Sequence, residues 1–367
     1  MEFIYVDFGI CFSQCLSASV VILLNMDGLL IINKPKGCTS HDVVARLRRI
    51  LSISKVGHTG TLDPDATGVL CLCIGKATRY AQYTSESEKE YRAVMKLGEV
   101  TDTQDASGKV IKETKEFNIT VEQIQEAFKK FTGTIKQIPP MYSAVKVGGT
   151  PLYKMARKGE EIHREPREIQ IMSIRLLDYF YESPSNPPLS PFSKVGRTTE
   201  LPPFDKGGMG GFGPLKFVSF DVRCSKGTYI RTLCNDIGDY LGVGAHMYSL
   251  ERIASGDFNI KDSITLEEAE ELSEMGQIES KLININEMVA WMPSVKINES
   301  WDSAVKNGRG IPAEAIKEIS GSFHKNSRVR IMDSRGEFLS IGSSLYDSDK
   351  IMDISCENVL KVERVLV

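Results

Sequence analysis

The sequence has little net charge, no patterned cysteine and no basic residue near its start. The formal charge of the 367 residues is −3, so the chain as a whole lacks the positive charge typical of many nucleic-acid-binding proteins. The eight cysteines form no Cys-x-x-Cys pair and no Cys/His spacing typical of a metal site. They therefore indicate the reduced thiols of a cytoplasmic protein, and we expect no metal.

The N-terminal stretch has no charge between Phe8 and Met26, and the first basic residue of the chain is Lys34. A secretory signal would begin with positive charge, and several serines interrupt the apolar run, which disfavours a membrane segment. We interpret residues 1–25 as a non-native extension and expect the folded protein to begin at Met26.

Charge is distributed unevenly along the chain. Six Lys/Arg stand against three Asp/Glu between His41 and Arg79, and the same ratio holds between Tyr142 and Arg167. Residues 262–279 hold seven carboxylates and no Lys or Arg. This asymmetry permits an anionic partner on one face of the molecule, although solvated helix faces would produce it as well.

Helices and strands are predicted from hydrophobic periodicity, cap residues and turn residues. Ser40 is expected to cap the first helix, and Thr120 and Thr265 should cap later ones through capping boxes. Predicted strands cover 28–33, 69–75, 89–97, 168–180, 216–224 and 245–254, predicted helices 40–51, 77–83, 121–131, 152–158, 229–241 and 265–272, and residues 101–108 should form a loop.

Two regions depart from this pattern. Seven of the fifteen prolines lie within residues 184–214, together with an approximate Pro-Phe-x-Lys repeat. Such a composition buries too little apolar surface to fold, which predicts a disordered insertion between two paired strands. From about residue 291 a short helix near 301–305 and strands at 328–332, 338–343 and 359–365 predict a small separate β module.

The central motif is the loop Gly57–Gly68, which contains His58, Asp63 and Asp65 and leads into an apolar strand. The downstream Gly-Lys-Ala-Thr does not fit a P-loop. Six residues instead of four separate Gly68 from Gly75, and Ala77 stands where a P-loop has a magnesium-binding hydroxyl. Two carboxylates flanking one proline cannot readily take opposed positions for glycoside hydrolysis. Asp63 alone, restricted by Pro64, is either a turn residue or a catalytic carboxylate.

Arg231 follows a strand and a glycine turn, where it is either an ordinary surface or core-edge arginine or a partner for Asp63. A guanidinium beside a buried carboxylate keeps that carboxylate ionised and oriented, as a nucleophile or base requires.

Several separated blocks carry a family resemblance. They are Asn33–Gly37 with Thr39–Ser40, Gly57–Gly68 with Gly75–Arg79, Tyr91–Arg92, Pro139–Lys146 and Cys224–Arg231. In this order they resemble the bacterial tRNA pseudouridine-55 synthase family (TruB type), over Met26–Val367 apart from the insertion.

The resemblance implies an isomerase that cleaves the C1′–N1 bond of a uridine in the T arm of tRNA and rejoins the base through C5. It places Asp63 on the catalytic aspartate and Arg231 on its paired arginine. It places Tyr91 against the target base, Leu250 on an apolar pocket wall and His58 on the histidine that helps to displace that base. Many relatives carry an apolar residue where this chain has Asp65.

We therefore predict an α+β fold with a mixed, mainly antiparallel central sheet and flanking helices. The catalytic domain should span residues 26–290 and a PUA-like RNA-binding domain residues 291–367. We expect no cofactor, no membrane contact, a cytoplasmic location, and a monomer with tRNA as partner and no obligatory protein partner. The candidates for contacts with RNA phosphates are basic: Lys34, Lys36, Arg46, Arg49, Lys146, Lys154, Arg157 and Lys158.

Two alternatives remain open at the level of sequence. One is an RNA-binding or tRNA-folding protein without catalytic activity. The other is a pseudouridine synthase for a different RNA, guided by partners, which the bacterial-style block Lys34–Ser40 disfavours.

Overall fold

The computed structural model describes residues 26–85, 87–143, 145–156, 158–160, 162–180, 215–354 and 357–366. The predicted extension (1–25) and the predicted insertion (184–214) lie outside these residues. Within the described ranges, no helix has the length and apolar character needed to span a bilayer.

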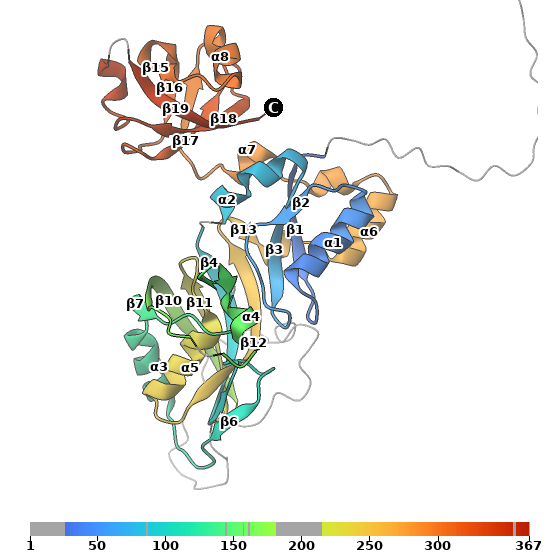
Figure 1. Cartoon of the computed structure of the whole chain (residues 1–367), viewed down its shortest axis with the longest axis vertical. Coiled ribbons are helices and arrows are strands. Elements are labelled where there is room, and N and C mark those ends of the chain that lie inside the picture. The colour runs from blue at the N-terminus through green and yellow to red at the C-terminus, as the bar shows by residue number, and fades with distance from the viewer. Residues whose placement is uncertain are drawn as a thin grey trace, which may run out of the picture.

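A nine-stranded sheet is built from strands that lie between Gly28 and Asn259 (Figure 1). Its main path in space is β1 (Gly28–Lys34), β3 (Thr67–Ile74), β12 (Ala245–Ser255), β4 (Lys89–Leu97), β11 (Phe217–Cys224), β10 (Arg167–Phe180) and β7 (Gly133–Gln137). β2 (Val56–His58) pairs with β3, and β13 (Phe258–Asn259) pairs with β12. Every pairing is antiparallel except the short parallel contact between β3 and β12. The predicted fold class is confirmed.

Helices pack beside the β1 edge of this sheet and against its middle. α1 (Ser40–Leu51) packs on α6 (Leu266–Glu274) beside β1, and α3 (Val121–Lys130) and α5 (Ile230–Tyr240) lie together near β10 and β12. One apolar cluster joins the inner faces of these helices to the sheet. The chain between β3 and β4 forms a 3-10 turn (Gly75–Tyr80) followed by the short α2 (Ala81–Thr84).

The predicted cap of the first helix is wrong by one residue. Thr39 is the N-cap of α1, with its hydroxyl accepting from the Asp42 amide in a capping box. The hydroxyl of Ser40 instead accepts from the Leu62 amide and donates to the Leu62 carbonyl. Ser40 therefore fastens the Asp63 loop to the start of α1, while the predicted capping boxes at Thr120 and Thr265 are confirmed.

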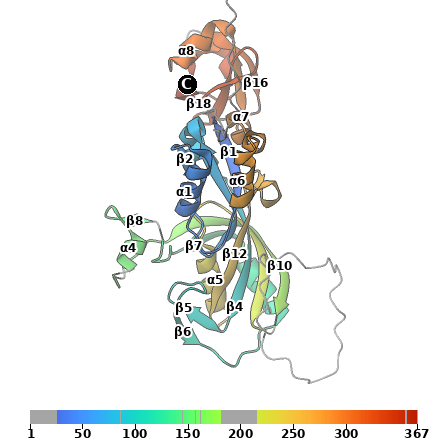
Figure 2. The ribbon, with the colours of Figure 1, turned by 90° about the vertical axis from the view of Figure 1, so that its right-hand side faces the viewer.

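Two small hairpins flank the sheet. β5 (Glu99–Thr101) pairs with β6 (Val110–Glu113), and their connection, residues 102–109, is the predicted loop. The Ala106 amide donates to the Met247 carbonyl, and the Met247 amide donates to the Gln104 carbonyl, so the loop is fixed to β12. β8 (Lys146–Val147), β9 (Thr150–Pro151) and α4 (Leu152–Ala156) form a segment that stands away from the sheet (Figure 2).

The C-terminal part is a six-stranded sheet with its own apolar core. The strands run in space as β15 (Ile311–Pro312), β19 (Asn358–Val365), β18 (Phe338–Ser344), β17 (Arg328–Met332), β14 (Ser294–Ile297) and β16 (Ile316–Ser320). The short α7 (Ile285–Met288) precedes it, and α8 (Asp302–Lys306) lies within it. A shared apolar cluster joins it to the large sheet, with the rings of Tyr80 and Phe338 5.6 Å apart.

Gly68 stands where β3 meets β12, and its backbone leaves no room for a side chain. Its φ is +97°, and an added Cβ would lie 2.3 Å from the Arg252 carbonyl oxygen. We expect Gly68→Ala to lower the free energy of unfolding by about 2–5 kcal/mol, because it adds backbone strain to overpacking. Gly57→Ala is the matched control, because an added Cβ at Gly57 meets nothing within 4 Å. Denaturant titration compares the two, and equal stabilities would contradict the packing described.

Candidate active site

The loop Gly57–Gly68 is held by donors from three different elements. Ser40 of α1 binds both backbone groups of Leu62. The Lys34 ammonium donates to the carbonyls of Pro64 and Ala66 at 3.0 and 2.7 Å. The Arg252 guanidinium of β12 donates to the Gly60 carbonyl at 3.0 Å and to the Val69 carbonyl at 2.7 Å. The backbone on both sides of Asp63 is therefore fixed by buried polar groups.

Lys34 corrects one prediction. It was expected to contact RNA phosphates, but it is fully buried, and its ammonium also donates to the Pro35 carbonyl at 2.9 Å. Burial lowers the pKa of Lys34, while nearby acidic groups, including Asp65 and Asp63, act in the opposite direction. Lys34 therefore supports the loop from inside and has no surface to offer to RNA.

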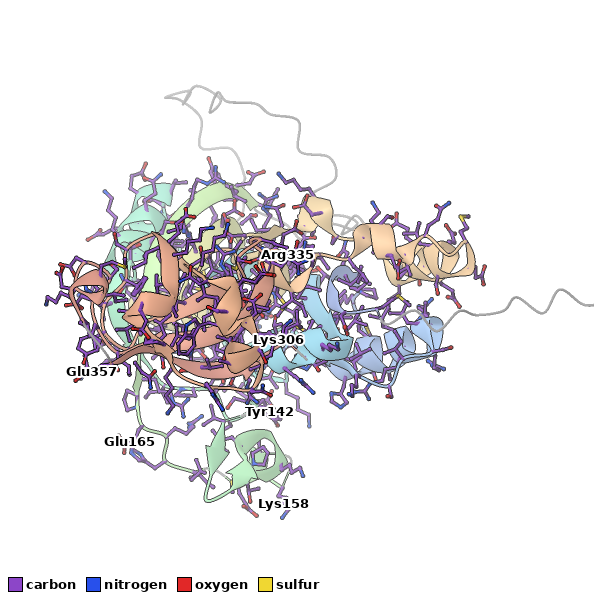
Figure 3. All side chains as sticks on the ribbon, turned by 90° about the horizontal axis from the view of Figure 1, so that it is seen from above. Tyr142, Lys158, Glu165, Lys306, Arg335 and Glu357 are labelled. Carbon is purple, nitrogen blue, oxygen red and sulfur yellow. The ribbon has the colours of Figure 1, made fainter. Side chains whose placement is uncertain are left out.

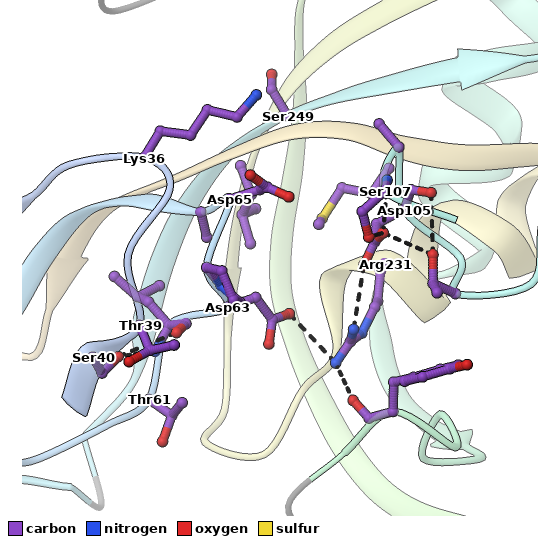
Figure 4. Close-up of a pocket in the computed structure, with 18 of the residues that line it drawn as sticks. Lys36, Thr39, Ser40, Thr61, Asp63, Asp65, Asp105, Ser107, Arg231 and Ser249 are labelled. Carbon is purple, nitrogen blue, oxygen red and sulfur yellow. Dashed lines mark hydrogen bonds and ion pairs between the residues drawn. The ribbon is translucent and has the colours of Figure 1, made fainter. Parts of the chain in front are cut away.

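Asp63 and Arg231 meet, as the family resemblance implies. An Asp63 carboxylate oxygen lies 3.3 Å from Nη2 of Arg231, whose side chain is only 7% exposed (Figure 4). The same guanidinium contacts the Asp105 carboxylate at 3.3 Å through Nη1 and donates to the Tyr142 carbonyl at 2.7 Å. Arg231 is therefore shared between two carboxylates that come from different loops.

Burial and nearby charges shift the pKa of the Asp63 carboxyl in opposite directions. Enclosure by the protein raises the pKa of the Asp63 carboxyl above its usual value, Arg231 lowers it, and the negative charge of Asp105 raises it. Asp65 is the last and smallest of the contributors that raise it. The side chain of Asp63 keeps 41% of its surface accessible, and it faces the cleft. A substrate that fills the cleft would remove the remaining water.

Two adjoining cavities meet at Asp63. An open cleft of about 660 Å³ is lined by Lys36, His58, Asp65 and Asp105. A deeper cavity of about 310 Å³ is lined by Tyr91 and by other groups from the sheet and from the start of α5. Asp63, Arg231 and Leu250 line both cavities. The structure thus places the predicted residues of the base pocket around a single carboxylate.

Tyr91 and His58 occupy different parts of this site. Tyr91 is buried on β4, where it stands opposite Arg252 of β12. His58 stands at the open cleft with its ring 6.4 Å from that of His41. Burial lowers the pKa of His58, with His41 and Arg252 adding to the effect, so the imidazole is neutral at physiological pH. Among the described residues, the buried Nδ1 of His58 has no hydrogen-bond partner.

The basic candidates for RNA contact differ in their surroundings. Lys36 is exposed and lines the open cleft. Lys154 and Lys158 are exposed on the projecting segment, and Figure 3 shows Lys158 at its tip. Arg46 is ion-paired to Glu267 and Glu270 at 2.8 and 3.2 Å. Arg49 is exposed on α1. The side chain of Lys146 and the whole of Arg157 lie outside what the structure describes.

Sequence reasoning missed Asp105 and Arg252. Asp105 lies in a segment predicted only as a loop, and its side chain also accepts from Thr103 and Ser107, which is ordinary turn chemistry. Its contact with Arg231 spans 126 positions in sequence, so no local pattern announces it. Arg252 lies in a predicted strand, where alternation places it on one face without indicating the carbonyls that it binds.

Family models match three consecutive parts of the chain. Residues 48–186 match the N-terminal domain of the TruB family pseudouridylate synthases, and residues 231–289 match the C-terminal domain of tRNA pseudouridylate synthase B. Residues 293–366 match the PUA domain.

Solved structures with a similar fold include a Cbf5-Nop10-Gar1 complex. It aligns with a TM-score of 0.68 and 28% identity over 92% of this chain and 84% of that one. A second is an H/ACA RNP bound to a substrate RNA containing 2'-deoxyuridine, with a TM-score of 0.67 and 26% identity over 93% of this chain and 85% of that one.

Curated relatives are similar over most of their length. The protein named tRNA pseudouridine synthase B from Bacillus pumilus is 40% identical over 86% of this chain and 92% of its own. The protein of the same name from Geobacillus thermodenitrificans is 42% identical over 81% of this chain and 89% of its own. Together with the domain matches, this similarity shows that the chain belongs to the TruB family of pseudouridylate synthases.

Proposed function

We propose that this protein isomerises a uridine in the T arm of tRNA to pseudouridine, with Asp63 as the catalytic residue. The observation that carries the proposal is the Asp63 carboxylate, ion-paired to Arg231 where the cleft meets the cavity of Tyr91 and Leu250. A reaction that rearranges one substrate requires no second reactant. The proposed roles therefore belong to side chains of this chain alone.

The identities of the relatives favour tRNA as the substrate. The relatives that are about 40% identical are named tRNA pseudouridine synthase B, while the structures of the H/ACA RNP and of the Cbf5-Nop10-Gar1 complex are 26% and 28% identical. A PUA domain match beside the catalytic part supports an RNA substrate with more than one contact region. We propose residues 26–290 as the catalytic domain and residues 291–367 as the RNA-binding domain, acting on tRNA as a monomer in the cytoplasm without an obligatory protein partner.

The target uridine must leave its stacked position before its glycosidic bond can be reached, which costs a few kcal/mol. The ring of Tyr91 and the side chain of Leu250 offer apolar contact to the displaced base. We propose that His58, which is neutral and lines the open cleft, occupies the vacated position in the RNA. These contacts offset the cost of displacement.

Asp63 acts in its ionised form in each reaction route that the site permits. A carboxylate can attack C1′, add to C6 of the base, or remove a proton from C2′. Arg231 stabilises the charged form and fixes the direction of the carboxylate, because its own guanidinium is held by Asp105, by the Tyr142 carbonyl and by the ring of Tyr229. Asp105 thus positions Arg231 while adding negative charge near Asp63.

Asp63→Asn should reduce pseudouridine formation by at least about 10³-fold, since the amide is neither a nucleophile nor a base. Release of tritium from a T-arm stem-loop that carries 5-tritiated uridine measures this. Asp65→Asn is the matched control and should stay within a few-fold of wild type, because Asp65 is exposed and contributes least to the pKa of Asp63. Equal release by Asp63→Asn and wild type would defeat the assignment, whereas stem-loop binding without release by wild type would favour an RNA-folding protein.

The acidic limb of the pH–rate profile should move when Asp105 is neutralised. Because the pKa of Asp63 is raised, activity falls as pH decreases through that raised value. Asp105→Asn removes a negative charge that raises the pKa, so the fall should occur at lower pH. Single-turnover rates across the acidic range test this, with a smaller shift in the same direction expected for Asp65→Asn. A shift to higher pH in Asp105→Asn would contradict the electrostatic account.

Lys36 and Arg46 should differ in their effect on RNA affinity. Lys36→Ala removes an exposed cation from the cleft, which should weaken stem-loop binding and reduce the slope of log K against log salt by about one. Arg46→Ala should leave both unchanged, because Glu267 and Glu270 already neutralise Arg46. Filter binding at several salt concentrations measures both variants, and a larger loss in Arg46→Ala would refute the distinction.

A further inference from the structure

Lys89 forms part of the floor of the base cavity, although the sequence patterns gave it no role. It lies two residues before Tyr91 on β4, so both side chains project from the same face of the sheet. On that face Tyr91 stands opposite Arg252 of β12, and Lys89 stands opposite Cys224 of β11. Lys89, Tyr91 and Arg252 all line the deeper cavity beside Asp63.

The Lys89 ammonium is held at this floor by backbone carbonyls. Only 6% of the residue is exposed. Nζ donates to the Ser87 carbonyl at 2.7 Å and lies 3.5 Å from the Ser85 carbonyl, both from the turn that precedes β4. A buried ammonium is expensive to desolvate, and it persists where other interactions repay the cost.

The groups around Lys89 leave its charge sensitive to mildly alkaline pH. Burial lowers the pKa of Lys89 to about 8, and the Arg252 and Lys226 cations lower it as well. The thiols of Cys71 on β3 and Cys224 on β11 act in the opposite direction. At neutral pH the floor of the cavity therefore holds two positive charges, Lys89 and Arg252, of which only Lys89 can lose its proton in the working range.

The proposed reaction places negative charge next to this floor. When the C1′–N1 bond breaks, its electron pair leaves with the base, which becomes a uracil anion with charge spread over N1 and the carbonyl oxygens. The anion then forms the C5–C1′ bond, C5 loses its proton and N1 gains one, so that no atom is added overall. Fixed cations beside a developing anion lower the barrier without reorganising during the reaction.

We propose that Lys89 is a further catalytic residue, whose ammonium stabilises the uracil anion in the cavity that Tyr91 and Arg252 also line. This inference rests on the proposed function and adds a residue to it. Lys34 provides the internal comparison: it is also a buried lysine bound to carbonyls, but it lines neither of the two cavities that meet at Asp63. A buried lysine in this protein therefore need not line the substrate cavity, whereas Lys89 does.

The test compares Lys89→Met, Lys89→Arg and wild type in single-turnover tritium release, together with stem-loop affinity and thermal unfolding. We expect Lys89→Met to react about 10²-fold more slowly at neutral pH with unchanged RNA affinity. The wild-type rate should fall as pH rises through about 8, where Lys89 loses its charge. Lys89→Arg should recover part of the rate and should show no such fall, because its guanidinium stays protonated. Lys226→Met, at the exposed end of the same cavity, removes a cation that lowers the pKa of Lys89, so it should move the alkaline fall in rate to higher pH.

Several outcomes would overturn the inference. They are a Lys89→Met rate within about twofold of wild type, a loss of rate in Lys89→Met that Lys89→Arg does not relieve at any pH, and a wild-type rate that stays constant through the titration of Lys89. If both variants fail to fold, the wild-type profile alone decides. The proposed function fails separately, if wild type releases no tritium or Asp63→Asn releases as much as wild type.

Discussion

The need to satisfy buried carbonyl oxygens governs the loop that presents Asp63. The loop has little regular structure of its own, and an unpaired buried carbonyl would cost about 1–3 kcal/mol. Lys34 and Arg252 supply the donors, from β1 and β12, and Ser40 adds a pair of bonds from α1. Because these donors belong to elements that are buried for other reasons, the carboxylate takes its position from the whole sheet.

Arg231 extends the same principle across the cleft. Asp63 comes from the β2–β3 connection, Asp105 from the β5–β6 connection, and Arg231 from the start of α5. A single guanidinium cannot fully neutralise two carboxylates, so its stabilisation of Asp63 depends on how closely it also engages Asp105. The site therefore adjusts the ionisation of its central carboxyl through geometry that three separate segments control.

The sequence predicted elements whose pattern is local and missed interactions whose partners are distant. Strand β4 begins and ends as predicted, because polar and apolar residues alternate over most of 89–97, with Val94 as the main exception, and polar turns flank it. The helix 40–51 was predicted with the wrong cap, since Thr39 and Ser40 are both good caps and only the distant Leu62 distinguishes them. The Asp63–Arg231 pair was foreseen through motif order, while Asp105 was not, because its turn chemistry masks its second contact. Lys34 was misjudged because a lysine in a turn is usually exposed.

The apolar cluster that joins the C-terminal sheet to the large sheet covers side chains that would otherwise favour aggregation. Tyr80 and Tyr83 are buried, and the cluster that contains them is completed by Met332, Phe338 and Ile341 of the C-terminal part. A chain truncated after α7 would expose this tyrosine-rich face to water, and contiguous apolar surface of this kind promotes aggregation. The β module thus protects the remainder of the molecule during its lifetime in a crowded solution, in addition to any contact that it makes with RNA.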